Sequence, residues 1–86
     1  MQMFGRFRDE RPPLQRALEA ASALKPGTWE SVESLAQLAI ACKGTPDAGR
    51  IYQSAYETAA ELKPGTYDSV RALAWLHRAG EELRSA

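Results

Sequence analysis

The sequence has only one cysteine and one histidine among its 86 residues. A lone cysteine excludes an internal disulfide, and one Cys with one His falls short of the ligands of a structural zinc site. Eleven basic and eleven acidic residues cancel, so no global field attracts nucleic acid or an anionic membrane. No apolar run approaches the roughly 18 residues of a membrane span, and the first residues lack the apolar run of a signal peptide. We therefore expect a cytoplasmic protein that binds no cofactor, no metal and no membrane.

What the sequence does contain is an internal repeat at an offset of 38 residues. The positions that recur identically are Gln15, Ala17, Glu19, Ala21, Leu24, Lys25, Pro26, Gly27, Thr28, Ser31, Val32, Leu35, Ala36, Leu38 and Ala41. Self-similarity at a period of about 20–50 residues indicates stacked supersecondary units. A chain of this length has room for one domain. We expect an N-terminal arm over residues 1–13 and a helical-repeat domain over 14–86, with units at about 14–48 and 52–86.

Each unit contains the same turn, Lys25-Pro26-Gly27-Thr28 or Lys63-Pro64-Gly65-Thr66. The proline disfavours helical geometry at the preceding lysine, the glycine allows a reversal, and the threonine is a good N-cap. Between the units, Gly44 is typical of a helix end, Thr45 of an N-cap and Pro46 of a first helical position. These signals predict helices at about 12–24, 28–43, 46–62 and 66–84.

Apolar residues at spacings of three and four indicate the core face of each predicted helix. In the first helix these are Leu14, Ala17, Leu18, Ala21 and Leu24, and in the second Val32, Leu35, Leu38, Ala39 and Cys42. In the third they are Ala48, Ile51, Tyr52, Ala55, Ala59 and Leu62, and in the fourth Val70, Leu73, Ala74, Leu76 and Leu83. The predicted fold is all-α: four antiparallel helices from a tandemly repeated helix–turn–helix unit, either a stacked helical repeat or a four-helix bundle.

Residues 51–64 resemble the second helix of a tetratricopeptide repeat. That family favours an aromatic residue, an alanine three residues later and a proline five beyond, and Tyr56, Ala59 and Pro64 match this pattern. The period of 38 differs from the family's 34, and Val32 stands at its Trp-type position. The resemblance implies a groove that binds a peptide or a protein, and not an enzyme.

No constellation of catalytic residues is evident. We interpret His77 as a residue at the boundary of the apolar face, because catalysis by a histidine needs a nucleophile or carboxylate beside it. We interpret Cys42 as a small buried apolar residue. The sequence therefore predicts no enzymatic activity.

The predicted fourth helix carries a tryptophan on a polar face. Trp75 lies about 200° around the helix from Leu73 and shares its face with Arg71 and Arg78. Trp and Arg dominate binding hot spots, so one interpretation is an interface anchor. The other is that the N-terminal arm covers Trp75, or that this helix is buried on two sides.

The N-terminal arm interleaves aromatic and basic residues, among them Phe4, Phe7 and Arg8. Such a pattern can bind nucleic acid by phosphate contact and stacking, dock on a protein, or be disordered. We predict a small non-enzymatic interaction or adaptor module whose partner is another protein or a second copy, with a homodimer as one form. Its predicted partner-binding residues are Trp75, Arg71, Arg78, Phe4, Phe7 and Arg8. The alternative is a nucleic-acid-binding regulator that uses the arm, which is only mildly basic.

Overall fold

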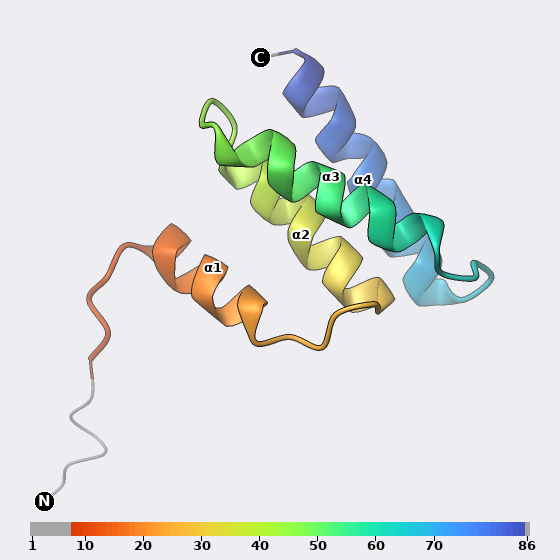
Figure 1. Ribbon diagram of the computed structural model, residues 1–86, viewed down its shortest axis with the longest axis horizontal. Coiled ribbons are helices and arrows are strands. Elements are labelled where there is room, and N and C mark those ends of the chain that lie inside the picture. The colour runs from red at the N-terminus through yellow and green to blue at the C-terminus, as the bar shows by residue number, and fades with distance from the viewer. Residues whose placement is uncertain (1–7, 86) are drawn as a thin grey trace, which may run out of the picture.

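The computed structural model describes residues 8–85, which form four α-helices and no strand. The helices are α1 (Pro13–Ser22), α2 (Trp29–Ala41), α3 (Asp47–Ala60) and α4 (Tyr67–Arg84). Successive helices run in opposite directions (Figure 1). The predicted all-α fold is confirmed, and every helix begins and ends within two residues of its predicted bounds.

Helices α2 and α4 begin with the same capping structure. The backbone N–H of Ser31 donates to the Thr28 hydroxyl oxygen at 3.0 Å, and the N–H of Thr28 donates to Ser31 Oγ at 3.2 Å. Thr66 and Ser69 repeat this reciprocal pair at 3.1 and 3.0 Å. Both helices start one residue after the capping threonine, so equivalent residues of the two units share one helical register.

The start of α3 differs from the prediction. The helix begins at Asp47 after Pro46, and no side chain caps it. The hydroxyl of Thr45 instead donates to the Cys42 carbonyl oxygen at 2.7 Å, which also accepts from the Thr45 N–H at 2.9 Å, so both bonds cap the end of α2. The predicted N-cap role of Thr45 is therefore wrong. Gly44 has a φ of 90° in this connection, a conformation that favours glycine.

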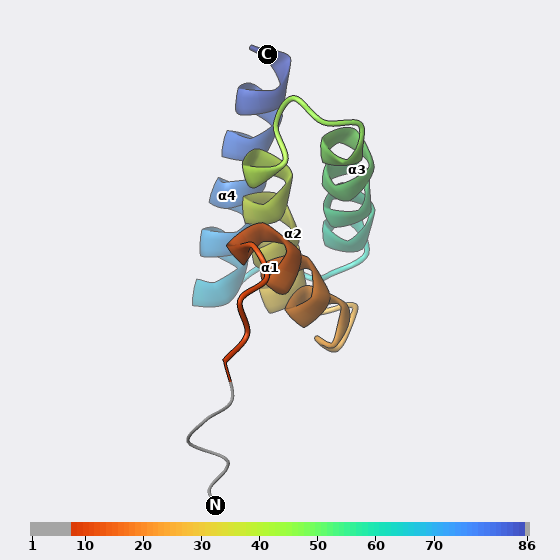
Figure 2. The ribbon, with the colours of Figure 1, turned by 90° about the vertical axis from the view of Figure 1, so that its left-hand side faces the viewer.

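Helix α2 is the centre of the fold. It packs extensively on α3 and α4, whereas α1 closely approaches only α2. Figure 2 shows α1 crossing in front of α2, with α4 and α3 flanking α2 at the left and the right. The larger core cluster consists of Val32, Ala36, Ala55, Ala59, Ala72, Leu76 and Ala79. Alanine dominates this cluster, which lets the helix axes approach closely.

The buried face of α4 is only partly the predicted one, since Leu76 and Leu83 are confirmed and the other three predicted residues are not. Its core residues are Ala72, Leu76 and Ala79, with Leu83 partly buried. By contrast, Val70 is 68% exposed and Leu73 39% exposed. The prediction that Val70 and Leu73 are core residues is wrong, as it is for Ala74, which is also exposed. Among the described residues, no helix covers this side of α4.

The same correction applies to α1. Leu14, Leu18 and Ala21 pack against the second core cluster, but Ala17 and Leu24 are exposed. No residue of α1 is fully buried. The predicted core faces of α2 and α3 are confirmed, with Leu35, Tyr52 and Leu62 half-buried at their edges.

Candidate protein-binding surfaces

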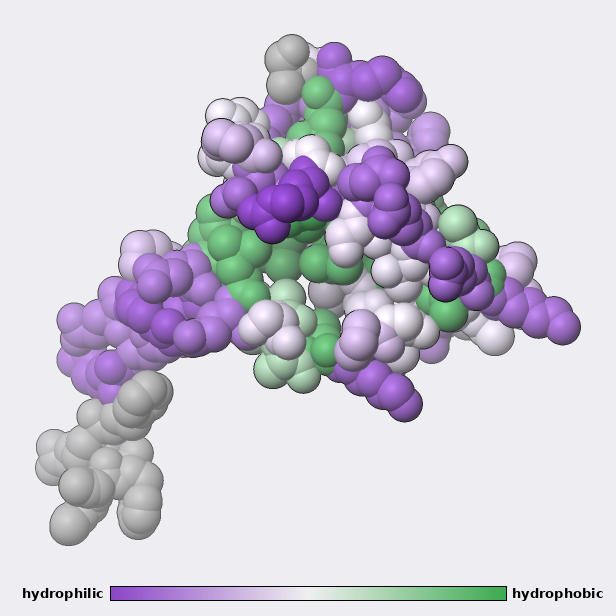
Figure 3. Space-filling view, viewed as in Figure 1, coloured by the Kyte–Doolittle hydropathy of each residue, from purple (hydrophilic) through white to green (hydrophobic). Residues whose placement is uncertain are grey.

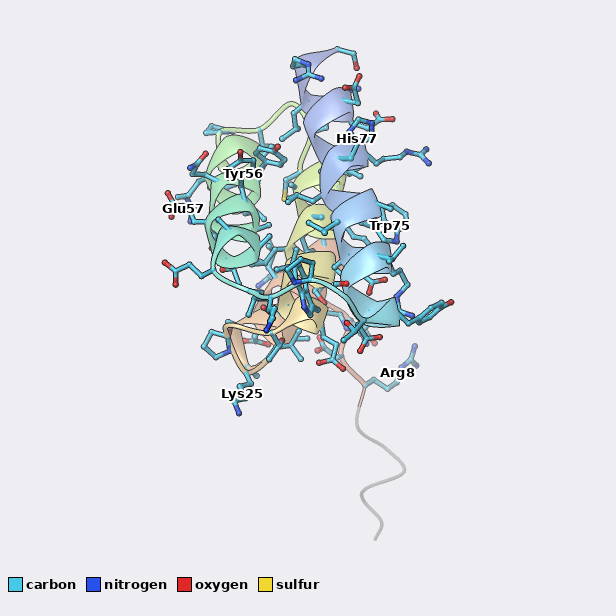
Figure 4. The ribbon with its side chains drawn as sticks, turned by 90° about the vertical axis from the view of Figure 1, so that its right-hand side faces the viewer. Arg8, Lys25, Tyr56, Glu57, Trp75 and His77 are labelled. Atoms are coloured by element: carbon cyan, nitrogen blue, oxygen red, sulfur yellow. The ribbon has the colours of Figure 1, made fainter. Side chains whose placement is uncertain are left out.

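Exposed apolar side chains gather where α3 and α4 face away from α2. We call this surface the C-terminal face; it consists of Tyr56, Ala60, Tyr67, Val70, Leu73 and Ala74. Tyr56 is 53% exposed and Tyr67 79% exposed. A shallow groove of about 230 Å³ runs between the helices here, lined by Tyr56, Ala59, Ala60, Leu73 and Leu76. Figure 4 looks onto this side of the molecule and shows Tyr56 projecting from α3 toward α4.

A second apolar surface lies between α1 and α2. It is an open groove of about 450 Å³, which we call the N-terminal groove. It is lined by Ala17, Ala20, Ala21, Leu24, Ser34, Gln37, Leu38 and Ala41. Figure 3, which views the molecule with α3 in front, shows further hydrophobic surface beside α1, whereas the outer side of α1 is hydrophilic. The lining is mostly apolar and has few polar groups, so it is suited to bind apolar side chains of a protein.

The structure brings three of the predicted partner-binding residues together. Arg71, Trp75 and Arg78 line a shallow pocket of about 230 Å³ with Ala74, which adjoins the C-terminal face. Trp75 is half-buried, because one side of its ring packs against the larger core cluster. Helix α4 thus packs through Trp75 as well as through its alanine-rich side. The exposed part of Trp75 points away from the fold (Figure 4).

Arg71 is held by acidic neighbours. Its Nε donates to Glu33 Oε1 of α2 at 2.8 Å, and its Nη2 donates to Asp68 Oδ1 at 3.4 Å. The hydrogen bond to Glu33 raises the pKa of the Arg71 guanidinium above its usual value. The guanidinium carbon also lies 5.5 Å from the ring centroid of Tyr67. Arg71 therefore joins α2 to α4 at the edge of the C-terminal face.

The described part of the arm does not join these surfaces. Arg8 is exposed and lies 3.6 Å from a Glu10 carboxylate oxygen, and Figure 4 shows it well apart from Trp75. Arg11 pairs with Asp9 at 2.6 Å and with Glu19 at 2.7 Å. The hydrogen bond from Arg11 holds the pKa of the Asp9 carboxyl well below its usual range. The predicted residues Phe4 and Phe7 lie outside the described residues.

The residues considered for chemistry are not gathered into a site. Cys42 is buried and free, and His77 is exposed on α4. Within residues 8–85, no group of three or more His, Cys, Asp or Glu side chains is placed to hold a metal ion. In the same range, no helix has the length and apolar character required to cross a membrane.

Sequence reasoning missed the exposed part of the C-terminal face. Val70 and Leu73 were assigned to the core, and Tyr56 and Tyr67 were not singled out as surface residues. One signal could have found them: the alanines of α4 allow closer approach to a neighbouring helix than Val70 and Leu73 do. Comparison with family models, with curated proteins and with solved structures found no match to this chain.

Proposed function

We propose that this chain is a protein–protein interaction module whose C-terminal face binds a helical segment of a protein. The observation that carries the proposal is the exposure of Val70, which is 68% exposed, while Val32 at the equivalent position is fully buried. Leaving apolar surface in water costs about 25 cal/mol per Å², so such a patch favours an apolar partner.

The shape of the surface supports a protein partner. The groove between α3 and α4 is shallow, whereas small-molecule sites are concave and bury most of the ligand. An amphipathic helix places apolar residues at spacings of three and four, which fits two adjacent helices that expose Tyr56 and Leu73. The tetratricopeptide resemblance, which implies a protein-binding groove, is part of the same proposal, as is a cytoplasmic location.

Trp75 and Arg78 extend the proposed site. They line the pocket beside Ala74, and the exposed part of the Trp75 ring extends the apolar surface of the C-terminal face. Tryptophan and arginine are the residue types that contribute most at the centres of protein interfaces. Arg78 is 65% exposed and lies 3.8 Å from Glu82, so a partner carboxylate would compete with Glu82 for its guanidinium group.

The described residues do not favour nucleic-acid binding. Arg8, Arg11 and Arg16 each lie within 4 Å of a carboxylate. A phosphate would have to compete with those carboxylates for the same guanidinium groups.

A capture experiment with a matched control tests the proposal. The tagged wild-type chain, the Val70→Glu variant and the Ala23→Glu variant are each used to capture proteins from the native host. We expect Val70→Glu to lose the partner, because a carboxylate would be desolvated against apolar side chains. We expect Ala23→Glu to retain it, since Ala23 is exposed and lines neither surface. Retention of every captured protein by Val70→Glu would overturn the proposal.

A further inference from the structure

Helix α4 has an exposed apolar face, and the equivalent face of α2 is buried by other helices of the same chain. Val32 and Ala36 of α2 are fully buried. They share one core cluster with Ala55 and Ala59 of α3 and with Leu76 of α4. Helices α3 and α4 therefore form a groove that receives the side chains of α2. The equivalent residues of α4, Val70 and Ala74, are exposed, because no helix within residues 8–85 packs on this side of α4.

Every copy of the chain contains a pair of helices that could cover Val70 and Ala74 of another copy. Helix α1 is equivalent to α3, and α2 is equivalent to α4, at the same offset of 38 residues. The groove residues that recur identically in the first unit are Ala17 for Ala55, Ala21 for Ala59, Leu24 for Leu62, Leu38 for Leu76 and Ala41 for Ala79. All five residues of the first unit line the N-terminal groove. This groove thus repeats the receptor site for α2 and is open.

We propose that the C-terminal face binds the N-terminal groove of a second copy, head to tail. Val70 and Ala74 of one copy insert between α1 and α2 of the next, as Val32 and Ala36 insert between α3 and α4 within the chain. This inference rests on the proposed function and names its partner. The repeat then continues from copy to copy with the packing that it already has inside one copy.

The positions of the two surfaces agree with this arrangement. Figure 2 looks onto the side of α2 that carries α1, and Figure 4 looks onto the opposite side, where α3 and α4 expose the C-terminal face. The two surfaces therefore do not meet within one copy, and each copy offers both. Because two different patches make the contact, the interface is heterologous and adds copies in an open row unless the rotation closes a ring.

Charge complementarity is preserved across the proposed interface. Inside the chain, Glu33 of α2 pairs with Arg71 of α4 at 2.8 Å, and these two residues occupy the same repeat position. In the proposed contact, Arg71 on α4 of one copy faces Glu33 on α2 of the next copy. Opposite charges face each other in both cases, so the carboxylates and guanidinium groups alternate along the row.

An aromatic contact is repeated in the same way. The indole N–H of Trp29 donates to the Lys63 carbonyl oxygen of the second turn at 3.2 Å. The equivalents of these residues are Tyr67, which is 79% exposed, and Lys25. In the proposed contact the Tyr67 ring lies over the Lys25-Pro26-Gly27-Thr28 turn of the next copy.

The interface between copies is more polar than the internal one. Ser34 replaces Ala72, and Gln37 replaces Trp75, in the lining of the N-terminal groove. Less apolar area is therefore buried between copies than within one. We expect reversible association that depends on concentration, not a permanent oligomer.

Measurements of solution mass with two complementary variants test the proposal. Sedimentation of the wild-type chain from about 10 µM to about 1 mM covers the range of weak association. We expect the wild-type mass to rise beyond that of a dimer. We expect Val70→Glu, which blocks the C-terminal face, and Ala17→Glu, which blocks the N-terminal groove, each to remain monomeric. An equimolar mixture of the two restores association and stops at a dimer, because each variant retains the surface that the other lacks.

Two controls keep the result interpretable. Ala23→Glu introduces the residue that the second unit already has at this position, Glu61, and should associate like the wild type. Circular dichroism at low concentration should show wild-type helicity for all variants, because Ala17, Ala23 and Val70 are exposed. If a glutamate variant fails to fold, Val70→Lys and Ala17→Lys provide the same complementary pair.

Three results would overturn the proposal. These are a wild-type chain that stays monomeric at about 1 mM, a dimer formed by Ala17→Glu alone, and a mixture of the variants that does not associate. The second result would indicate a symmetric contact through α4. A monomeric wild-type chain that still loses a captured protein in Val70→Glu would reject self-association and leave the proposed function standing.

Discussion

Val32 and Val70 occupy the same position of the repeat, but only Val32 is fully buried, and Val70 is 68% exposed. The same substitution at the two positions therefore shows how burial alone changes its effect on the free energy of unfolding. We expect Val32→Ala to lower the free energy of unfolding by about 2 kcal/mol, because it removes buried methyl groups and leaves a cavity. We expect Val70→Ala to change it by less than about 0.5 kcal/mol. Urea unfolding of dilute protein measures both, and equal losses would contradict the assigned burial.

The capping residues give a second prediction for single residues. Thr66 accepts a hydrogen bond from the Ser69 N–H at 3.1 Å, and Ser69 Oγ in turn accepts from the Thr66 N–H at 3.0 Å. We expect Thr66→Ala to destabilise the fold by about 0.5–2 kcal/mol, because the Ser69 N–H loses its side-chain acceptor and keeps only the Thr66 carbonyl oxygen. Thr66→Ser keeps the hydroxyl and should restore most of that loss. Denaturant midpoints measure the series, and a Thr66→Ser variant as unstable as Thr66→Ala would reject the capping role.

At the scale of elements, the bounds of the helices were predictable because their signals are local. The threonine caps and the Pro-Gly turns act on the backbone within a few residues, so they can be read from the chain alone. Thr45 shows the limit of this reading. Its hydroxyl had two possible partners, the first turn of α3 and the last carbonyls of α2, and it bonds to Cys42 at the end of α2.

The buried side of α4 was not predictable from spacing. Helix α4 carries one apolar set with Ala72, Leu76 and Ala79 and another with Val70 and Leu73. Periodicity detects either set but does not tell which one meets a neighbour. Packing on α2 selects the first set, since small alanines allow close approach of the two helices. The second set, with its exposed apolar residues, then forms the candidate site.

Helix α1 is expected to be the least stable element of the fold. It has no fully buried residue, and it closely approaches only α2. Few buried contacts imply a low free energy of local opening. In dilute protein we expect amide hydrogens of α1 to exchange faster than those of α2, which is packed on three sides. Hydrogen exchange read by mass spectrometry measures this order. Equal protection of α1 and α2 in dilute protein would contradict it.

At the scale of the whole molecule, this chain resembles a segment cut from a longer row of helices. Each internal unit of such an array is stabilised by its own packing and by its neighbours. Within residues 8–85, α2 packs on α1, α3 and α4, whereas α1 closely approaches only α2 and no helix packs on the Val70 side of α4. Some uncovered residues are identical to their covered equivalents: exposed Ala17 corresponds to buried Ala55, and exposed Val70 corresponds to buried Val32. Polar residues replace only part of the two end surfaces, such as Gln37 at the position of Trp75 and His77 at the position of buried Ala39.

This incomplete capping predicts that thermal stability depends on protein concentration. If only folded copies associate, association stabilises the native state by about 1.4 kcal/mol for each tenfold excess of free protein over Kd. For a domain of this size, 1 kcal/mol corresponds to about 4–8 °C in Tm. We therefore expect the wild-type Tm to rise by several degrees with each tenfold increase in concentration above Kd. The Tm of Val70→Glu should stay constant and equal that of the dilute wild-type chain, because Val70 makes its contacts only in the assembly.

Melting curves followed by circular dichroism in cells of different path length measure the Tm of both proteins. A wild-type Tm that is independent of concentration up to about 1 mM would show that the end faces are stable without a second copy.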